Sequence, residues 1–356
     1  MSLEQLAQVV GISVPQLSKI ENGKTTASIP SLVKLGRELK RPVAYFLQTD
    51  SEVPRCLGTL VPRWDTEGAA IQRFADLVKE GSNGELSIAV FSGSQLGTAT
   101  GQVDGLINGL IDVFVENLGF FSRHADVARI ISLPFCFLDE DHYLRFKSSA
   151  LFERELRQVL RDKSVELLGE NWNWRRGPQL VIVAKQPIWS PADLKGIRIR
   201  SPENVIFSKY LAMLGADPVV VPWSDVSDAF AAGTFDALIT NLSHVVSMRF
   251  TRIARHVTLL KYRPLDLSFA MNVQRYQMLV PSFQNALEDA AFKAGKYCSE
   301  LLDATSQQLN QQVEEDEAVV SRVSIRPWQT ESRNTIAKLE QQGYWRLGLF
   351  DAISAL

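Results

Sequence analysis

The sequence contains few cysteines, and they are poorly placed for a metal site or a disulfide framework. Cys56, Cys136 and Cys298 are odd in number and lie far apart along the 356 residues. This spacing matches no metal-binding motif and argues against paired disulfides. We therefore expect three buried thiols, because free cysteine packs as a small apolar residue.

Long apolar segments are also missing. No stretch reaches the roughly 18 apolar residues that a transmembrane helix requires. The first twenty residues carry Glu4 and Lys19 and have no apolar core of the length found in secretion signals. From these absences we expect a cytoplasmic protein without a membrane span.

Catalytic motifs are absent as well. The sequence has no G-x-S-x-G, no Walker loop, no H-E-x-x-H and no G-x-G-x-x-G after a strand. The histidines, His124, His142, His244 and His256, show no ligand spacing to one another. We expect each to be a surface or helix residue, and the chain to be neither an enzyme nor the carrier of a cofactor or metal.

The composition is that of an ordinary globular protein. Hydrophobic residues make up 46% and charged residues 22%, which is enough for real cores, and 356 residues can hold more than one domain. The net charge of −2 gives no overall basic field that would indicate a nucleic-acid partner.

The first fifty residues have the pattern of a small helical module. Ala7, Gly11, Leu17 and Ile20 stand at offsets 0, 4, 10 and 13, and Ser13 can cap the second helix. A helix–turn–helix needs this spacing, with a small residue where the helices cross, a glycine in the left-handed turn, and two aliphatics that seat the second helix.

This module resembles the Cro-repressor-like (XRE) helix-turn-helix family in the run SLEQLAQVVGISVPQLSKIENGKTTASIPSLVKLGRELKRPVAYFLQ. The resemblance implies that the helix beginning near Ser13 enters the major groove of a DNA operator. Because one module reads a half-site only, it also implies a homodimer. The family has a further helix before the position of Ser2, so we expect the module to lack its first helix and to be marginal alone. The residues expected to face DNA are Ser13, Val14, Gln16, Ser18, Lys19 and Lys24.

After a polar, proline-containing linker at residues 51–57, short apolar strands alternate with helices, which predicts a largely parallel sheet. Arg200, Trp223, Thr240 and Asn241 fall at the ends of three predicted strands. Ligands of α/β sheets bind beyond the carboxyl ends of strands. The sequence therefore places a cation, an aromatic ring and two polar side chains around one crevice.

Residues 58–350 resemble the solute-binding proteins of TRAP (tripartite ATP-independent) transporters. Four motifs carry the resemblance in order: FADLVKEGSNGELSIAVFSGSQLG, LPFCF-LDEDHY, SPADLKGIRIRSPEN and LGADPVVVPWSDVSDAFAAGTFDALITN. It implies a periplasmic-binding-protein-like fold of two α/β lobes, joined by hinge strands and a long bracing helix, that closes over an organic acid.

The same resemblance assigns candidate ligand-binding residues. Arg200 matches the arginine that grips the ligand carboxylate, for which a planar guanidinium is suited. The usual Glu-Asn pair after the third strand is missing, so Thr240 or Asn241 would have to serve. The second arginine of many relatives is displaced or absent, and Arg176 is the nearest candidate. The remaining positions carried over are Glu116, Asn117 and Trp223.

Together these features predict a ligand-responsive, DNA-binding transcriptional regulator whose solute-binding domain senses a small organic acid. The alternative is the substrate-binding component of a TRAP transporter for carboxylate uptake, which requires export. A third interpretation gives the first fifty residues a role in protein interaction only, as a helical hairpin without a DNA function.

Overall fold

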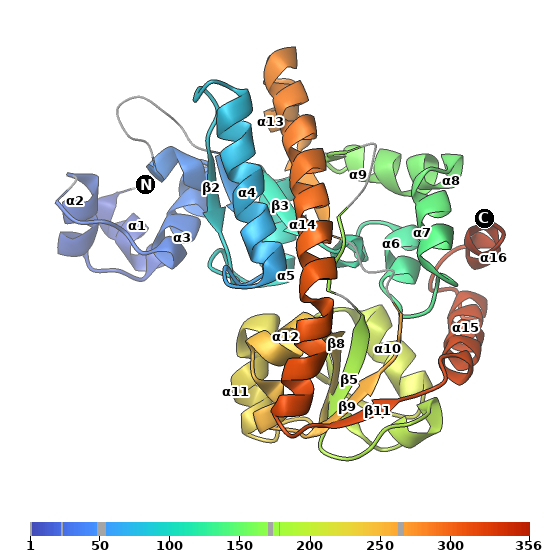
Figure 1. Cartoon of the computed structure of the whole chain (residues 1–356). Helices are drawn as coiled ribbons and strands as arrows, with labels where there is room; N and C mark the ends of the chain where they lie inside the picture. Colours follow the sequence, from blue (N-terminus) through green and yellow to red (C-terminus); the bar gives the residue numbers. More distant parts are fainter. Residues whose placement is uncertain (1, 23, 48–54, 170–173, 178, 263–266) are drawn as a thin grey trace.

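The computed structural model has three structural parts (Figure 1). A helical module is followed by two α/β lobes, and one long helix runs beside both lobes. The structure describes residues 2–22, 24–47, 55–169, 174–177, 179–262 and 267–356. Its two-lobed fold and helical N-terminal segment agree with the fold expected from the sequence.

The helical module begins and ends its helices at the residues that the sequence indicated. Ser13 Oγ accepts a hydrogen bond from the backbone of Gln16, and Gly11 closes the first helix with a φ of 75°. A left-handed residue there is what glycine permits at no steric cost. The elements of the module are α1 (Leu3–Val10), α2 (Val14–Glu21), α3 (Ile29–Leu39) and the 3-10 helix η1 (Val43–Leu47).

The core of this module continues into the first lobe. Val10, Leu32 and Val43 share one buried cluster with Phe91 and Ile111 of the lobe. This contact supplies apolar burial that an incomplete helix-turn-helix lacks by itself. The strand β1 begins at residue 55, so the predicted linker at 51–57 extends too far; its earlier part lies outside the described residues.

The first lobe is built on a five-stranded sheet of order β2-β1-β3-β10-β4. Its strands are β1 (Arg55–Gly58), β2 (Ile88–Phe91), β3 (Val113–Glu116), β4 (Val165–Leu167) and β10 (Ser268–Asn272). Strand β10 returns from the second lobe and pairs antiparallel with β3 and β4, so the sheet is mixed rather than largely parallel. The helices of this half are α4 (Thr66–Gly81), α5 (Ala99–Ile107), η2 (Leu118–Phe121), α6 (Asp126–Ile131), α7 (Glu140–Lys147), α8 (Ala150–Phe152), the π-helical turn η3 (Glu153–Arg157), α9 (Gln158–Arg161) and α13 (Val273–Gln277).

The second lobe has a six-stranded sheet of order β11-β9-β5-β8-β6-β7. The strands are β5 (Leu180–Ala184), β6 (Arg198–Ser201), β7 (Asp217–Val220), β8 (Ala237–Asn241), β9 (His256–Leu259) and β11 (Val319–Arg322). Strands β6, β7 and β8 run parallel, so their carboxyl ends meet at one edge, as the sequence predicted. The helices are η4 (Pro191–Leu194), α10 (Val205–Met213), η5 (Trp223–Asp225), α11 (Val226–Ala231), α12 (Leu242–Ser247) and η6 (Phe250–Arg252).

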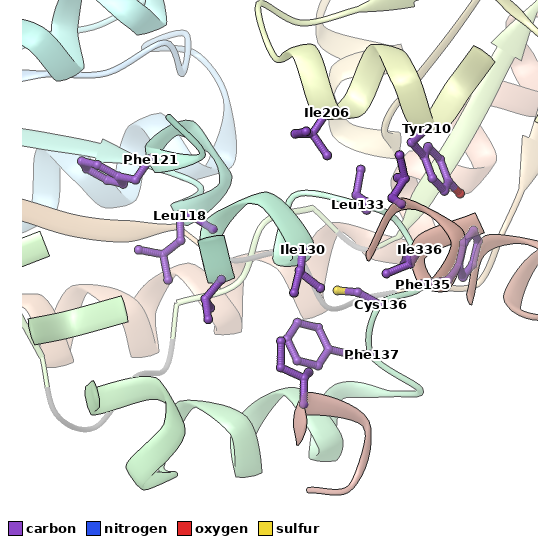
Figure 2. Packing of buried hydrophobic residues seen from close by; sticks show 14 of the residues in the cluster. Leu118, Phe121, Ile130, Leu133, Phe135, Cys136, Phe137, Ile206, Tyr210 and Ile336 are labelled. Carbon is purple, nitrogen blue, oxygen red and sulfur yellow. The ribbon is translucent and has the colours of Figure 1, made fainter. Parts of the chain in front are cut away.

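Long-range packing ties the lobes together. Helix α14 (Pro281–Glu315) spans 35 residues and packs on α4 of the first lobe and α12 of the second (Figure 1). Figure 2 shows a buried cluster in which Phe135 and Cys136 meet Tyr210 of α10 and Ile336 of α15 (Arg326–Gln341). The chain ends in α16 (Leu349–Ser354). All three cysteines are free and buried, as expected.

Candidate functional site

A cavity of about 200 Å³ lies between the two lobes. It is bounded by Leu60 and Phe120 of the first lobe and by the carboxyl ends of the strands of the second. Six of the seven residues expected at a ligand site line it: Asn117, Arg176, Arg200, Trp223, Thr240 and Asn241.

Arg200 is a buried cation that forms no ion pair with any residue that the structure describes. It lies at the end of β6 and is 9% exposed. Its Nε donates to the carbonyl oxygen of Val221 at 3.0 Å, and its guanidinium carbon lies 5.4 Å from the centre of the Trp223 ring. Among the described residues no carboxylate lies within ion-pair distance of Arg200. Burial lowers the pKa of Arg200 to about 9, because a charged group without a partner is poorly stabilised away from water.

A second arginine of the same strand, Arg198, differs from Arg200 in its exposure and its ion pairing. Arg198 is half-exposed and forms two hydrogen bonds to Asp236, at 2.8 and 2.9 Å. Two arginines two residues apart therefore have opposite surroundings, one paired at the surface and one unpaired in the cavity. An anion entering the cavity would provide the partner that Arg200 lacks.

Arg176, the other cation of the cavity, is already neutralised. It forms an ion pair with Glu116, whose side chain has no exposed surface and also accepts a hydrogen bond from the Leu60 backbone at 3.2 Å. Glu116 therefore lies behind the cavity wall and does not line it, in contrast to the sequence expectation. Its role in the geometry is to hold Arg176 in place.

Two further carboxylates, Glu67 and Asp65, lie near the ion pair of Arg176 and Glu116. Glu67 accepts a hydrogen bond from the Gly177 backbone at 2.8 Å, and burial raises its pKa. Burial also raises the pKa of Asp65 to about 7. Because three acids lie close to Arg176, its positive charge is already balanced within the part of the chain that the structure describes.

Gly177 fixes the approach of this segment to the second lobe. Its φ is +60°, and an added Cβ would lie 2.6 Å from the Cβ of Asn241. Only glycine combines this backbone conformation with this approach. The position of Arg176 at the cavity wall therefore depends on the glycine at position 177.

His244 is a residue of the site that the sequence did not indicate. We expected a surface or helix residue, and it is a buried helix residue of α12 that lines the cavity. Its Nδ1 lies 3.0 Å from Thr240 Oγ1, its ring is 4.7 Å from that of Trp223, and its Nε2 is 3.5 Å from Asp65 of the first lobe. Burial, with Arg176 and Arg200 nearby, lowers the pKa of His244. His244 is therefore neutral, and its ring packs against the ring of Trp223.

The residues expected to face DNA lie on the outer side of the helical module. Figure 1 places α2 on the side of the module away from the lobes. Five of the six are exposed: Ser13, Val14, Gln16, Lys19 and Lys24. Ser18 is half-buried, and its backbone carbonyl and hydroxyl oxygens accept from Asn22 at 2.7 and 3.4 Å.

The chain matches two protein families. Residues 57–342 match bacterial extracellular solute-binding protein, family 7, and residues 1–46 match a helix-turn-helix family. The 2,3-diketo-L-gulonate-binding periplasmic protein YiaO of Escherichia coli is 29% identical over 248 residues, which cover 69% of this chain and 74% of that protein.

Solved structures share the fold of the two lobes. A TRAP periplasmic solute-binding protein of Roseobacter denitrificans with bound L-galactonate superimposes with a TM-score of 0.75 at 20% identity, covering 84% of this chain and 98% of that one. A second, from Xanthobacter autotrophicus with bound beta-D-galacturonate, has a TM-score of 0.74 at 21% identity, with 84% and 97% covered. These relatives are solute-binding proteins rather than enzymes.

The expected cytoplasmic location is wrong, because these relatives are periplasmic proteins by name. Among the described residues no helix has both the length and the apolar character to cross a membrane.

Proposed function

The chain belongs to the bacterial extracellular solute-binding proteins of family 7, and from that premise we propose that its cleft binds the carboxylate of a small organic acid. We propose that it serves as the substrate-binding component of a TRAP-type carboxylate transporter and catalyses no reaction. The observation that carries this proposal is Arg200, a buried guanidinium in a cavity between two lobes, with no ion pair to any described carboxylate.

The neighbours of Arg200 suit this role. Its Nε is already bonded to Val221, which leaves the terminal nitrogens for the ligand carboxylate. The ring of Trp223 lies against the guanidinium and limits its movement. A carboxylate bound there forms charge-assisted hydrogen bonds away from water, which by truncation are worth about 2–5 kcal/mol.

The remaining polar groups orient the ligand. Asn117 comes from the first lobe, whereas Thr240 and Asn241 come from the second, so a ligand that contacts both sets holds the lobes together. We propose residues 58–350 as the solute-binding unit, with the start of β1 added to it. Closure of two lobes on a ligand is an established hinge motion.

Calorimetry on the whole chain tests the proposal. Small hydroxylated acids such as L-galactonate and D-galacturonate should bind, and the neutral sugar D-galactose should not, because it has no group that pairs with Arg200. X-ray scattering should show a smaller radius of gyration with a bound acid. Equal binding of the neutral sugar, or no binding of any acid in a screen of mono- and dicarboxylates, would rule the proposal out.

A second candidate function is operator binding by the helical module, as part of a ligand-responsive transcriptional regulator. It is supported by the match of residues 1–46 to a helix-turn-helix family and by the exposed side chains of α2. Gln16 can contact base edges, while Lys19 and Lys24 can reach phosphates. A homodimer would place two such helices on two half-sites.

Selection of binding sites from random duplex DNA tests this candidate. The native chain should enrich one sequence, and the double variant Gln16→Ala, Lys19→Ala should enrich none. Thr25→Ala, an exposed change outside α2, is the control and should keep the native preference. No enrichment by the native chain leaves the module without a DNA function, and the interpretation as a protein-interaction module then gains support.

A further inference from the structure

The cleft has a second, outer chamber of about 110 Å³ that adjoins the main cavity. The two chambers share part of their walls, so they lie next to each other in the cleft. The shared residues are Asn117, Phe120, Ser132, Pro202, Glu203 and Phe207. A ligand longer than the main cavity would extend into this chamber.

Glu203 stands where the two chambers meet. Its side chain is exposed and forms no ion pair or hydrogen bond to any residue that the structure describes. Its carboxylate acts on Arg200 through space and raises the pKa of that arginine against the larger effect of burial. A ligand carboxylate held by Arg200 and a second charge farther along the ligand would both be affected by Glu203.

His124 is among the residues that line the outer chamber. The Nε2 of His124 is shielded from solvent and has no hydrogen-bond partner among the described residues. Burial, with Arg123 beside it, lowers the pKa of His124, so this ring is neutral near pH 7. Asn204 of the second lobe donates to Ser132 Oγ of the first at 3.2 Å, which closes one side of the chamber.

The charges around the outer chamber favour hydroxyl groups over a carboxylate. Asp104 and Glu203 supply two negative charges, and Arg123, which is exposed to water, supplies one positive charge. A ligand hydroxyl can donate to Glu203 and bond with the His124 ring. A carboxylate at the same position would face lining residues with one net negative charge, although water screens the exposed Glu203.

We propose that the outer chamber binds the hydroxylated end of an extended monocarboxylate, and that Glu203 determines specificity by rejecting dicarboxylates of the same length. This inference rests on the proposed function, because it requires one ligand carboxylate at Arg200. It adds a subsite and a class of ligand, namely acids with one carboxylate and a polyhydroxylated chain.

Two six-carbon acids that differ only at the far end test the inference. Galactonate ends in a hydroxymethyl group and galactarate in a second carboxylate. By calorimetry the native chain should bind galactonate about twofold to fivefold more tightly than galactarate, because a like-charge contact with an exposed carboxylate is screened by water. Glu203→Gln should bring the two affinities to within about 1.5-fold, since the repulsion is removed while a polar side chain of the same size stays.

Matched controls separate specificity from damage. Glu85→Gln removes an exposed carboxylate elsewhere in the first lobe and should leave the ratio of affinities unchanged. His124→Ala should weaken galactonate and leave L-lactate, which fills only the main cavity, unaffected.

The outcomes distinguish a failure of the inference about Glu203 from a failure of the proposed function. Equal binding of both acids by the native chain, or a ratio unchanged in Glu203→Gln, overturns the inference and leaves the proposed function intact. Absence of binding by galactonate, galactarate and L-lactate alike counts against the proposed function itself. Collapse of the preference in Glu203→Gln with retention in Glu85→Gln supports the inference.

Discussion

Arg200→Met is the substitution with the clearest consequence, because it keeps an apolar stem of similar length and removes the charge. In the unliganded protein the guanidinium is buried beside Trp223, and no carboxylate in the described part of the chain forms an ion pair with it. The variant should therefore lose ligand affinity without losing stability. This separation of two effects distinguishes a ligand-binding arginine from a structural one.

The magnitude follows from the pKa of Arg200, which burial lowers to about 9. Because a tenfold change in a protonation constant corresponds to about 1.36 kcal/mol, a lowering of this size amounts to roughly 5 kcal/mol for keeping the group charged at pH 7. Because this pKa is lowered in the folded state, the full cost applies at every pH below 9. Loss of the bond to Val221 and of the ring contact offsets about 1–3 kcal/mol of it.

We therefore expect the unliganded Arg200→Met protein to be at least as stable as the native one. Urea unfolding measures this, and calorimetry with galactonate should show an affinity about 30-fold to several thousand-fold lower, from about 2–5 kcal/mol. Arg198→Met is the control, since that arginine pairs with Asp236 at the surface. It should leave ligand affinity unchanged.

The reasoning about Arg200 is refuted by the opposite pattern. If Arg200→Met lowers the free energy of unfolding by more than about 1 kcal/mol while calorimetry shows native affinity, the guanidinium supports the fold and the ligand lies elsewhere.

Three further predictions concern the surroundings of the cavity. Burial raises the pKa of Asp65 to about 7, so its contribution to the free energy of unfolding is complete below pH 3.8 and is lost as the pH rises through about 7. Between pH 5 and 8 the free energy of unfolding of Asp65→Asn, measured in urea, should therefore rise by about 2–3 kcal/mol relative to that of the native protein. A difference that stays constant with pH would contradict this. Gly177→Ala should cost about 2–4 kcal/mol, since its Cβ meets Asn241 at 2.6 Å. Gly196→Ala, with a φ of +71° and no neighbour within 4 Å, should cost only about 1 kcal/mol; equal costs would show that the contact is unimportant. Trp223→Leu should weaken galactonate binding about threefold to tenfold by calorimetry through loss of the ring contact, and native affinity would assign that ring to packing.

The part of the site that the sequence predicted rests on one rule of sheet geometry. Parallel strands bring their carboxyl ends to one edge; Arg200 and Thr240 are the last but one residues of β6 and β8, and Trp223 follows β7. Local capping preference is a weaker guide to the start of the following helix, because Ser201 and Asn204 are both residue types that favour the cap position. Ser201 belongs to β6, and the cap of α10 is Asn204, which accepts from two backbone amides. Pairing of Ser201 with β7 outweighed its local preference as a helix cap.

The charges behind the cavity could not be predicted in this way. Glu67 meets Gly177 across 110 residues, and Asp65 and His244 come from different lobes. Burial of an acid depends on such distant contacts, and no local pattern reports them. The mixed first sheet has the same origin, because β10 enters it only after the chain has built most of the second lobe.

The helical module is attached to the first lobe, and this attachment affects its orientation. The backbone amide of Val43 is bonded to the carbonyl of Leu110 at 2.9 Å, just beyond the last turn of α5, whereas Ala99 at the first turn of the same helix borders the cavity. Nine residues of helix, about 14 Å, therefore separate solute from module. Any partner that binds the outer face of α2 therefore binds a module that is attached to the first lobe. Under the proposed closure of the two lobes on a ligand, the angle between this module and the second lobe would change.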